Sequence, residues 1–279
     1  MFRTLKIGIC ALFIAAATQP SDACTLWAVT GPSANGGTII SKNRDWKPDH
    51  TQLLKHVRTG RGFAFFGLYA EGNDEPGIKA GINEKGLTIV SASTNIPRKT
   101  LLNQPGKRGI MTMILEKYAT IDDLLTDADR VFSSARAGFF LIADRRKALV
   151  AEVGLDGKYS LRQVENATTT HTNHYLAPEL AALYNEKIGK SSATRLARIN
   201  QLLAEASPPF SVAQFVGMSR DRHDGPDDSL WRTGKSMTLA SWIVESPAHG
   251  APRLHVTVAN PNEKEVVHDY ILDETFWGR

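Results

Sequence analysis

The chain has 279 residues, and its 33 basic and 29 acidic side chains give a net charge of +4 at neutral pH. This basic excess is too small to indicate binding to nucleic acid. The length suits one large domain or two small ones, and we favour one because no long linker interrupts the sequence.

The first residues have the three parts of a secretory signal. A basic start with Arg3 and Lys6 precedes an apolar run at 7–17, and small residues then lead to Ala23. The apolar run is shorter than the roughly 20 residues that a membrane-spanning helix needs. We therefore expect removal of residues 1–23 and a mature domain, 24–279, that is periplasmic or secreted and has no membrane span.

Cleavage after Ala23 would make Cys24 the first residue of the mature protein. Cys10 would leave with the signal, so Cys24 would have no disulfide partner in an oxidising compartment. An N-terminal cysteine combines a thiol nucleophile with an α-amino group, whose pKa of roughly 7.7 to 8.0 suits a base near neutral pH. Two alternatives stay open: an ordinary small apolar residue in a strand, and a lipid-anchored binding protein acylated at Cys24.

Five β-rich runs follow Cys24 and predict an antiparallel sheet. They cover 25–31, 37–46, 62–70, 78–82 and 86–94. Turn-forming residues at 32–37 and 83–86 join neighbouring runs and predict hairpins.

Helical and strand-like runs alternate in blocks through the rest of the chain. The helical runs lie at 111–128, 177–184, 192–206 and 211–219, and the strand-like runs at 137–144, 147–154, 237–246, 253–260 and 265–272. Ser191 or Ser192 is the expected N-cap of the third helical run. This arrangement predicts an α+β fold, with two antiparallel sheets and helices packed outside them.

Several short motifs occur in order along the predicted mature chain. They are "SKNRDW" at 41–46, "AGINEKGL" at 80–87, "TNIP" at 94–97, "HTNHY" at 171–175 and "SSATRLARI" at 191–199. Together with a cysteine at a processing junction, they resemble the N-terminal nucleophile (Ntn) cysteine hydrolases of the choloylglycine hydrolase and penicillin V acylase type. "DRHDGPDDSLW" and "MTLASWIV" are most similar to the acyl-coenzyme A:6-aminopenicillanate acyltransferase and carcinine hydrolase branch.

The resemblance implies a four-layer αββα sandwich and a set of catalytic residues. Cys24 matches the nucleophile, and Asp45 matches the carboxylate that holds its α-amino group. Asn173 matches the oxyanion-hole asparagine, and Arg195 matches the arginine that supports the cysteine end of the site. Arg198 lies one turn further on the same predicted helix, and we expect it to be structural.

Two positions beside these residues concern the substrate and the charge near the thiol. Asn95 matches a substrate-pocket residue, and a main-chain N–H near it is the second expected oxyanion donor. Lys42 stands where the hydrolase pattern commonly has arginine. Arg44 would share the strand face of Lys42 and partly compensate for this change.

The resemblance implies that a small-molecule linear amide is cleaved at its C–N bond through a thioester on Cys24, which water or an amine then resolves. It implies no cofactor. No zinc-like spacing surrounds His171, His174 or His223, so we expect no metal site. A dipeptidase of the same superfamily, with a pocket for a free substrate amine, and a homo-oligomeric state both stay open.

Overall fold

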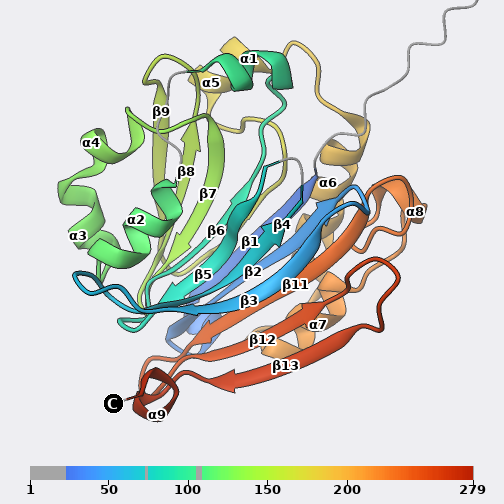
Figure 1. Cartoon of the computed structure of the whole chain (residues 1–279). Coiled ribbons are helices and arrows are strands. Elements are labelled where there is room, and N and C mark those ends of the chain that lie inside the picture. The colour runs from blue at the N-terminus through green and yellow to red at the C-terminus, as the bar shows by residue number, and fades with distance from the viewer. Residues whose placement is uncertain (1–22, 73–74, 105–108, 279) are drawn as a thin grey trace, which may run out of the picture.

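The computed structural model describes residues 23–72, 75–104 and 109–278. The predicted signal segment lies outside these residues, apart from Ala23. Figure 1 shows two β-sheets packed face to face, with helices on both outer sides. No helix in the described ranges is long and apolar enough to cross a membrane.

Sheet A has six antiparallel strands in the order β10-β1-β2-β11-β12-β13. Its strands are β1 (Cys24–Gly31), β2 (Gly37–Trp46), β10 (Thr168–His171), β11 (Met237–Ser246), β12 (Arg253–Val258) and β13 (Val266–Ile271). A 3₁₀ turn, Pro32–Ala34, joins β1 to β2, and Asn35 and Gly36 complete it with φ angles of 52° and 80°. The predicted first hairpin is therefore confirmed, and it places Cys24 at the end of a strand.

Sheet B has seven antiparallel strands that follow one another in chain order. They are β3 (Thr51–Val57), β4 (Phe65–Glu71), β5 (Gly77–Asn83), β6 (Thr88–Ala92), β7 (Gly138–Ala143), β8 (Ala148–Val153) and β9 (Tyr159–Val164). The predicted turn between β5 and β6 depends on Asn83, whose Oδ1 accepts from the main-chain N–H groups of Lys85 and Leu87 at 3.0 Å each. These two hydrogen bonds hold the turn in place, so the Asn83 side chain helps to set how β5 and β6 pair.

The helices form the two outer layers. Those on sheet B are α2 (Ile110–Lys117), α3 (Ile121–Thr126) and α4 (Ala128–Phe132), and those on sheet A are α6 (Lys190–Glu205) and α7 (Val212–Ser219). The other helices lie at the edges: α1 (Arg98–Asn103), α5 (Pro178–Tyr184), α8 (Gly225–Asp228) and α9 (Glu274–Trp277). The predicted four-layer αββα arrangement is confirmed.

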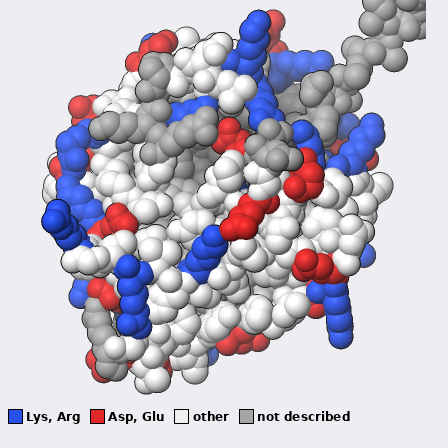
Figure 2. All heavy atoms as spheres, viewed as in Figure 1, with Lys and Arg blue, Asp and Glu red and all other residues white. Residues whose placement is uncertain are grey.

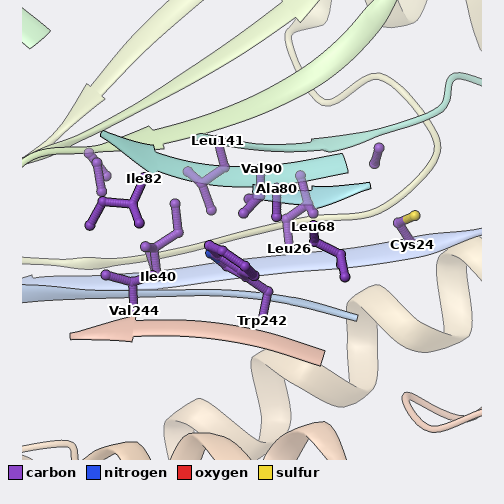
Figure 3. Packing of buried hydrophobic residues seen from close by; sticks show 14 of the residues in the cluster. Cys24, Leu26, Ile40, Leu68, Ala80, Ile82, Val90, Leu141, Trp242 and Val244 are labelled. Atoms are coloured by element: carbon purple, nitrogen blue, oxygen red, sulfur yellow. The ribbon is translucent and has the colours of Figure 1, made fainter. Parts of the chain in front are cut away.

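Apolar side chains pack under the helices of each sheet, and a further apolar cluster fills the space between the two sheets (Figure 3). Leu26, Ile40 and Trp242 contribute to it from sheet A, and Leu68 and Leu141 contribute from sheet B. Burial of such side chains contributes roughly 25 cal/mol for each Å² of apolar surface removed from water. Cys24 lies at one end of this cluster, where the apolar packing gives way to polar groups.

The predicted N-cap of α6 is wrong. The helix begins at Lys190, and Gly189 occupies the N-cap without a capping side chain. Both serine hydroxyls bind elsewhere: Ser191 donates to the Asp227 carbonyl at 3.0 Å, and Ser192 accepts from the Asn173 N–H at 2.9 Å. The two hydroxyl groups that the sequence pattern assigned to the N-cap therefore bind residues outside the helix.

Two β-bulges lie near the end of the sandwich that contains Cys24. In β11, Leu239 is an extra residue between Thr238 and Ala240, which pair with Asp45 and Arg44. The second bulge places an extra residue, Lys79, in β5. Bulges of this kind redirect side chains at the strand positions beside them.

Candidate active site

Cys24 is the first residue of β1 and pairs with Arg44 on β2. Its side chain is only 3% exposed and lies at the end of the apolar cluster between the sheets (Figure 3). The thiol nevertheless contributes to the wall of a cavity of about 830 Å³. A small molecule in that cavity would therefore reach the sulfur from one side.

Two basic side chains control the charge of the thiol. Lys42 is 1% exposed, and its Nζ donates to the main-chain carbonyl of Ser91 and hydrogen-bonds to the Cys24 thiol. Burial alone would raise the pKa of Cys24, but the positive charges of Lys42 and Arg44 outweigh it and the net shift is downward. The site therefore favours the thiolate, which is the nucleophilic form of cysteine.

Asn173 holds the main chain of Cys24. Its Oδ1 accepts from the Cys24 N–H at 3.0 Å and from Arg195 Nη2 at 2.9 Å. Its Nδ2 donates to the Ser93 carbonyl at 2.8 Å and lies 3.4 Å from the Ser93 hydroxyl. These partners fix which end of the amide faces the cysteine nitrogen.

Arg195 enters the site from α6 and has no exposed surface. Its Nη1 donates to the Cys24 carbonyl at 2.6 Å and to the Thr25 hydroxyl at 2.9 Å. Burial lowers its pKa to about 10, and the negative charge of Asp45 opposes this shift. The guanidinium thus connects the start of β1 to Asn173, and its charge acts on the nearby Asp45 carboxylate.

Asp45 lies on the other face of β2 from Lys42 and Arg44, because alternate residues of a strand face opposite sides. Its Oδ1 accepts from the Thr238 hydroxyl at 2.7 Å, and its Oδ2 is buried and accepts no hydrogen bond from the described part of the chain. Burial raises the pKa of this carboxyl, while the charges of Arg232 and Arg195 oppose the rise.

The structure therefore brings Cys24, Lys42, Asp45, Asn173 and Arg195 together. In this chain the Cys24 nitrogen is still bonded to Ala23, and it donates to Asn173. The predicted pairing of Asp45 with a free α-amino group stays a prediction.

Asn95 lines the same cavity, but its side chain turns toward the end of α5. Its Nδ2 donates to the Tyr184 carbonyl at 2.9 Å and to Asn185 Oδ1 at 3.2 Å. These contacts position the loop after β6, which forms part of the cavity wall. The predicted role of Asn95 in substrate binding stays a prediction.

Four site residues were absent from the sequence prediction. Thr238 and Arg232 lie beside Asp45, Ser93 accepts from Asn173, and Ser192 accepts from the Asn173 N–H. Thr238 and Ser192 belong to the quoted motifs "MTLASWIV" and "SSATRLARI", so the motifs contained them without indicating their roles. Arg232 follows the quoted "DRHDGPDDSLW" directly.

The three histidines considered as possible ligands have other partners. His171 packs against Phe139 with its ring tilted by 41° and lies 3.4 Å from Glu152. His174 bonds to Ser192, and His223 lies beside Asp224. Among the residues that the structure describes, no group of three or more His, Cys, Asp or Glu side chains is arranged to hold a metal ion.

Arg198, which we expected to be structural, forms an ion pair with Asp221. Its guanidinium makes a two-point contact with Asp221 at 2.7 and 3.2 Å, and both side chains are mostly buried.

Comparison with known structures supports the Ntn-hydrolase fold. Two structures of conjugated bile acid hydrolase variants from Clostridium perfringens match with TM-scores of 0.55 each, at 10% and 11% identity. Each match covers 89% of this chain and 92% of the other. A Caenorhabditis elegans ortholog of N-acylethanolamine-hydrolyzing acid amidase matches with a TM-score of 0.52 and 13% identity, over 80% of this chain and 92% of the other.

Sequence comparison identifies the family. No curated protein matches the chain. The family described as acyl-coenzyme A:6-aminopenicillanic acid acyl-transferase matches residues 33–263, a range that begins after Cys24 and includes all the other predicted site residues. The chain therefore belongs to this acyl-transferase family, and it shares the fold of the hydrolases compared above.

Proposed function

We propose that the chain is an exported enzyme that takes the acyl group of a small linear amide onto Cys24 as a thioester. One observation supports this most directly: the Cys24 thiol lies at the wall of a cavity, beside Lys42 and Arg44, which favour its ionised form. Water then releases the acyl group as an acid, or a second amine takes it as a new amide.

The proposed reaction has two balanced steps. In the first, the Cys24 sulfur bonds to the substrate carbonyl carbon, and the C–N bond breaks after the thiol proton reaches the leaving nitrogen. In the second, water or an amine attacks the thioester, and the sulfur leaves and regains a proton. A base that carries the proton in both steps is required, and the α-amino group of a mature Cys24 has a suitable pKa.

The surroundings of the Cys24 nitrogen support this role for the α-amino group. Here the nitrogen is an amide with one hydrogen, which it donates to Asn173 Oδ1. Cleavage after Ala23 would give it additional hydrogens. Asp45 Oδ2 is a buried acceptor that the described residues leave without a donor, and we assign it to the protonated amine. An ammonium held in this way is stabilised by the carboxylate during turnover.

Asn173 is our candidate for stabilising the tetrahedral intermediate. Of the two hydrogens on its Nδ2, one is bound by the Ser93 carbonyl at 2.8 Å. The contact with the Ser93 hydroxyl is longer, at 3.4 Å, so a substrate oxyanion can replace it. A donor in that position acts mainly on the transition state, where the negative charge develops.

The proposal is tested by trapping the acyl group. The purified mature protein is mixed with a panel of chromogenic amides that differ in acyl chain, quenched with acid and measured by intact mass and peptide mapping. We expect an acyl adduct on Cys24 and none on a Cys24→Ser variant treated in the same way. Turnover with the adduct on another residue would refute the assignment. Addition of an acceptor amine separates transfer from hydrolysis through the product that forms.

The N-terminus provides a second test. A variant that starts Met-Lys-Cys24, with an extension that is not removed, should fold and be inactive, because its Cys24 nitrogen is an amide that cannot accept a proton near neutral pH. Full activity, with mass spectrometry showing the extension intact, would mean that another group is the base. The mass of the exported protein also tests the alternative of a lipid anchor, because a diacylglyceryl adduct on Cys24 would exclude the enzyme proposed here.

A further inference from the structure

The cavity beside Cys24 is lined by more basic than acidic side chains. Among the described residues, six basic side chains and one acidic side chain, that of Glu75, line it. The basic residues are Lys42, Arg44, Lys47, Lys79, Arg98 and Arg136. We propose that Lys79, with Lys42 and Arg44 beside it, binds an anionic group of the amide substrate, such as a carboxylate. This inference rests on the proposed function, because it assumes that the cavity holds the substrate.

A β-bulge gives Lys79 its position. Leu68 and Tyr69 are consecutive on β4, but their partners on β5 are Ala80 and Ile78, so Lys79 is the extra residue. Ala80 packs between the two sheets, whereas Ile78 packs against the cluster under the helices of sheet B. In a regular strand Lys79 would face those helices, on the opposite side from Ala80. With the bulge, its side chain lies near Lys42, Arg44 and Cys24 of sheet A and lines the cavity.

Lys79 has hydrogen-bond donors available for a ligand. Its Nζ donates to the main-chain carbonyl of Glu75 at 2.7 Å, and this is its one hydrogen bond within the described part of the chain. An ammonium carries three N–H donors, so two can reach a bound group. Lys42, by contrast, already binds the Ser91 carbonyl and the Cys24 thiol.

The three cations lie close enough to influence one another. Burial, together with the positive charges of Arg44 and Lys42, lowers the pKa of Lys79 to about 7. Glu75 and the Cys24 thiol oppose this shift. An anion bound at Lys79 would relieve the repulsion and favour the charged ammonium. The charges of Lys42, Arg44 and Lys79 thus favour the binding of an anionic ligand in this part of the cavity.

The face in Figure 2 does not show the basic excess of the cavity lining. On the face in Figure 2, acidic and basic side chains are interspersed. A cleft lined by one sign of charge concentrates ligands of the opposite sign. The same charge repels an ammonium, so the cavity does not suit a dipeptidase that binds the free amine of its substrate.

Two matched pairs of probes test the proposal and locate the charge. N-phenylacetylglycine and N-phenylacetylglycinamide differ in a carboxylate on the amine side of the amide. N-benzylsuccinamic acid and N-benzylbutanamide differ in a carboxylate on the acyl side. Calorimetry measures the binding of each probe to a mature Cys24→Ala protein, which cannot form the thioester. We expect the anionic member of at least one pair to bind about 10- to 100-fold more tightly than its neutral partner.

Substitutions connect that preference to Lys79. Lys79→Met should abolish it, and Lys79→Arg should keep much of it because the charge remains. The control is Lys85→Met, which removes an exposed lysine in the turn after the same strand, outside the cavity lining. Far-UV circular dichroism establishes that each variant is folded. A preference that survives Lys79→Met would overturn the proposal, as would equal binding within both pairs or no binding of either anionic probe at millimolar concentration.

The binding measurements separate this inference from the proposed function. Turnover of the four probes is followed with native Cys24. If the anionic probes bind through Lys79 but no amide in the panel is cleaved, the anion site stands and the proposed reaction fails. If amides are cleaved with no preference between charged and neutral partners, the reaction stands and the anion site fails.

Discussion

Replacement of Arg195 by methionine should destabilise the whole Cys24 end of the sandwich. The native guanidinium is fully buried and donates to the Cys24 carbonyl at 2.6 Å, the Thr25 hydroxyl at 2.9 Å and Asn173 Oδ1 at 2.9 Å. Methionine keeps a long, unbranched and adaptable side chain but has none of the donors. Most of the loss should therefore come from hydrogen bonds and charge rather than from packing.

The structure sets the expected size of the loss. Removal of one partner from a buried ionic group typically costs about 3–5 kcal/mol. The individual hydrogen bonds do not add to this in full, because Arg232 still faces Asp45 and Asn173 Oδ1 keeps its bond from the Cys24 N–H. We expect a loss of about 3–5 kcal/mol in the free energy of unfolding, from a total that is typically about 5–15 kcal/mol.

Arg198→Met is the matched control, since it makes the same change one turn later in α6. The charged partner of Arg198 is Asp221 at 2.7 Å, with side-chain exposures of 15% and 13%, so water can solvate both groups once they separate. Its other side-chain partner is the exposed, neutral Gln201. We expect this variant to lose about 1 kcal/mol. Urea unfolding followed by circular dichroism measures both variants. Equal losses, or a larger loss for Arg198→Met, would refute the reasoning.

Three further predictions concern the reaction. Cys24→Ser should keep the fold and lose most amide turnover, because a hydroxyl is a much poorer nucleophile near neutral pH; unchanged turnover would exclude Cys24 as nucleophile. Asn173→Ala should lower kcat by about 10²- to 10³-fold with little change in KM, and an effect confined to KM would remove Asn173 from the oxyanion site. Lys42→Met removes a positive charge that lowers the pKa of the Cys24 thiol, so alkylation by iodoacetamide should require higher pH; an unmoved rate profile would contradict this.

The sequence predicts the parts of the fold where local chemistry and burial agree. The hairpin of β1 and β2 has a turn rich in small residues between two fully buried strands, and both signals are strong. By contrast, β3, β9 and β10 were not predicted. β3 and β9 are largely exposed or half-buried, so neither has the apolar pattern of a core strand. β10 has only four residues, Thr168–His171, and it is a strand because it pairs with the edge of β1.

In the site, too, some residues can be found from short sequence motifs and others only from the folded structure. Cys24, Asp45, Asn173 and Arg195 could be proposed from short motifs, and the fold brings them together. Lys79 could not be proposed in this way, because a lysine within "IKAGI" has no local feature that distinguishes it from a surface residue. Its orientation depends on a bulge that exists only when β5 pairs with β4.

The proposed mechanism uses both the thiol and the α-amino group of Cys24, and strand β2 provides different residues for each. Lys42 and Arg44 face the cavity and set the charge of the thiol, whereas Asp45 faces the other side, toward Arg195. A shift of one residue in register would exchange these faces and place the carboxylate beside the sulfur. Its negative charge already opposes the lowered pKa of the Cys24 thiol, and beside the sulfur it would raise that pKa further. The pairing of β2 with β1 and with the bulged β11 is therefore a condition of the chemistry as well as of the fold.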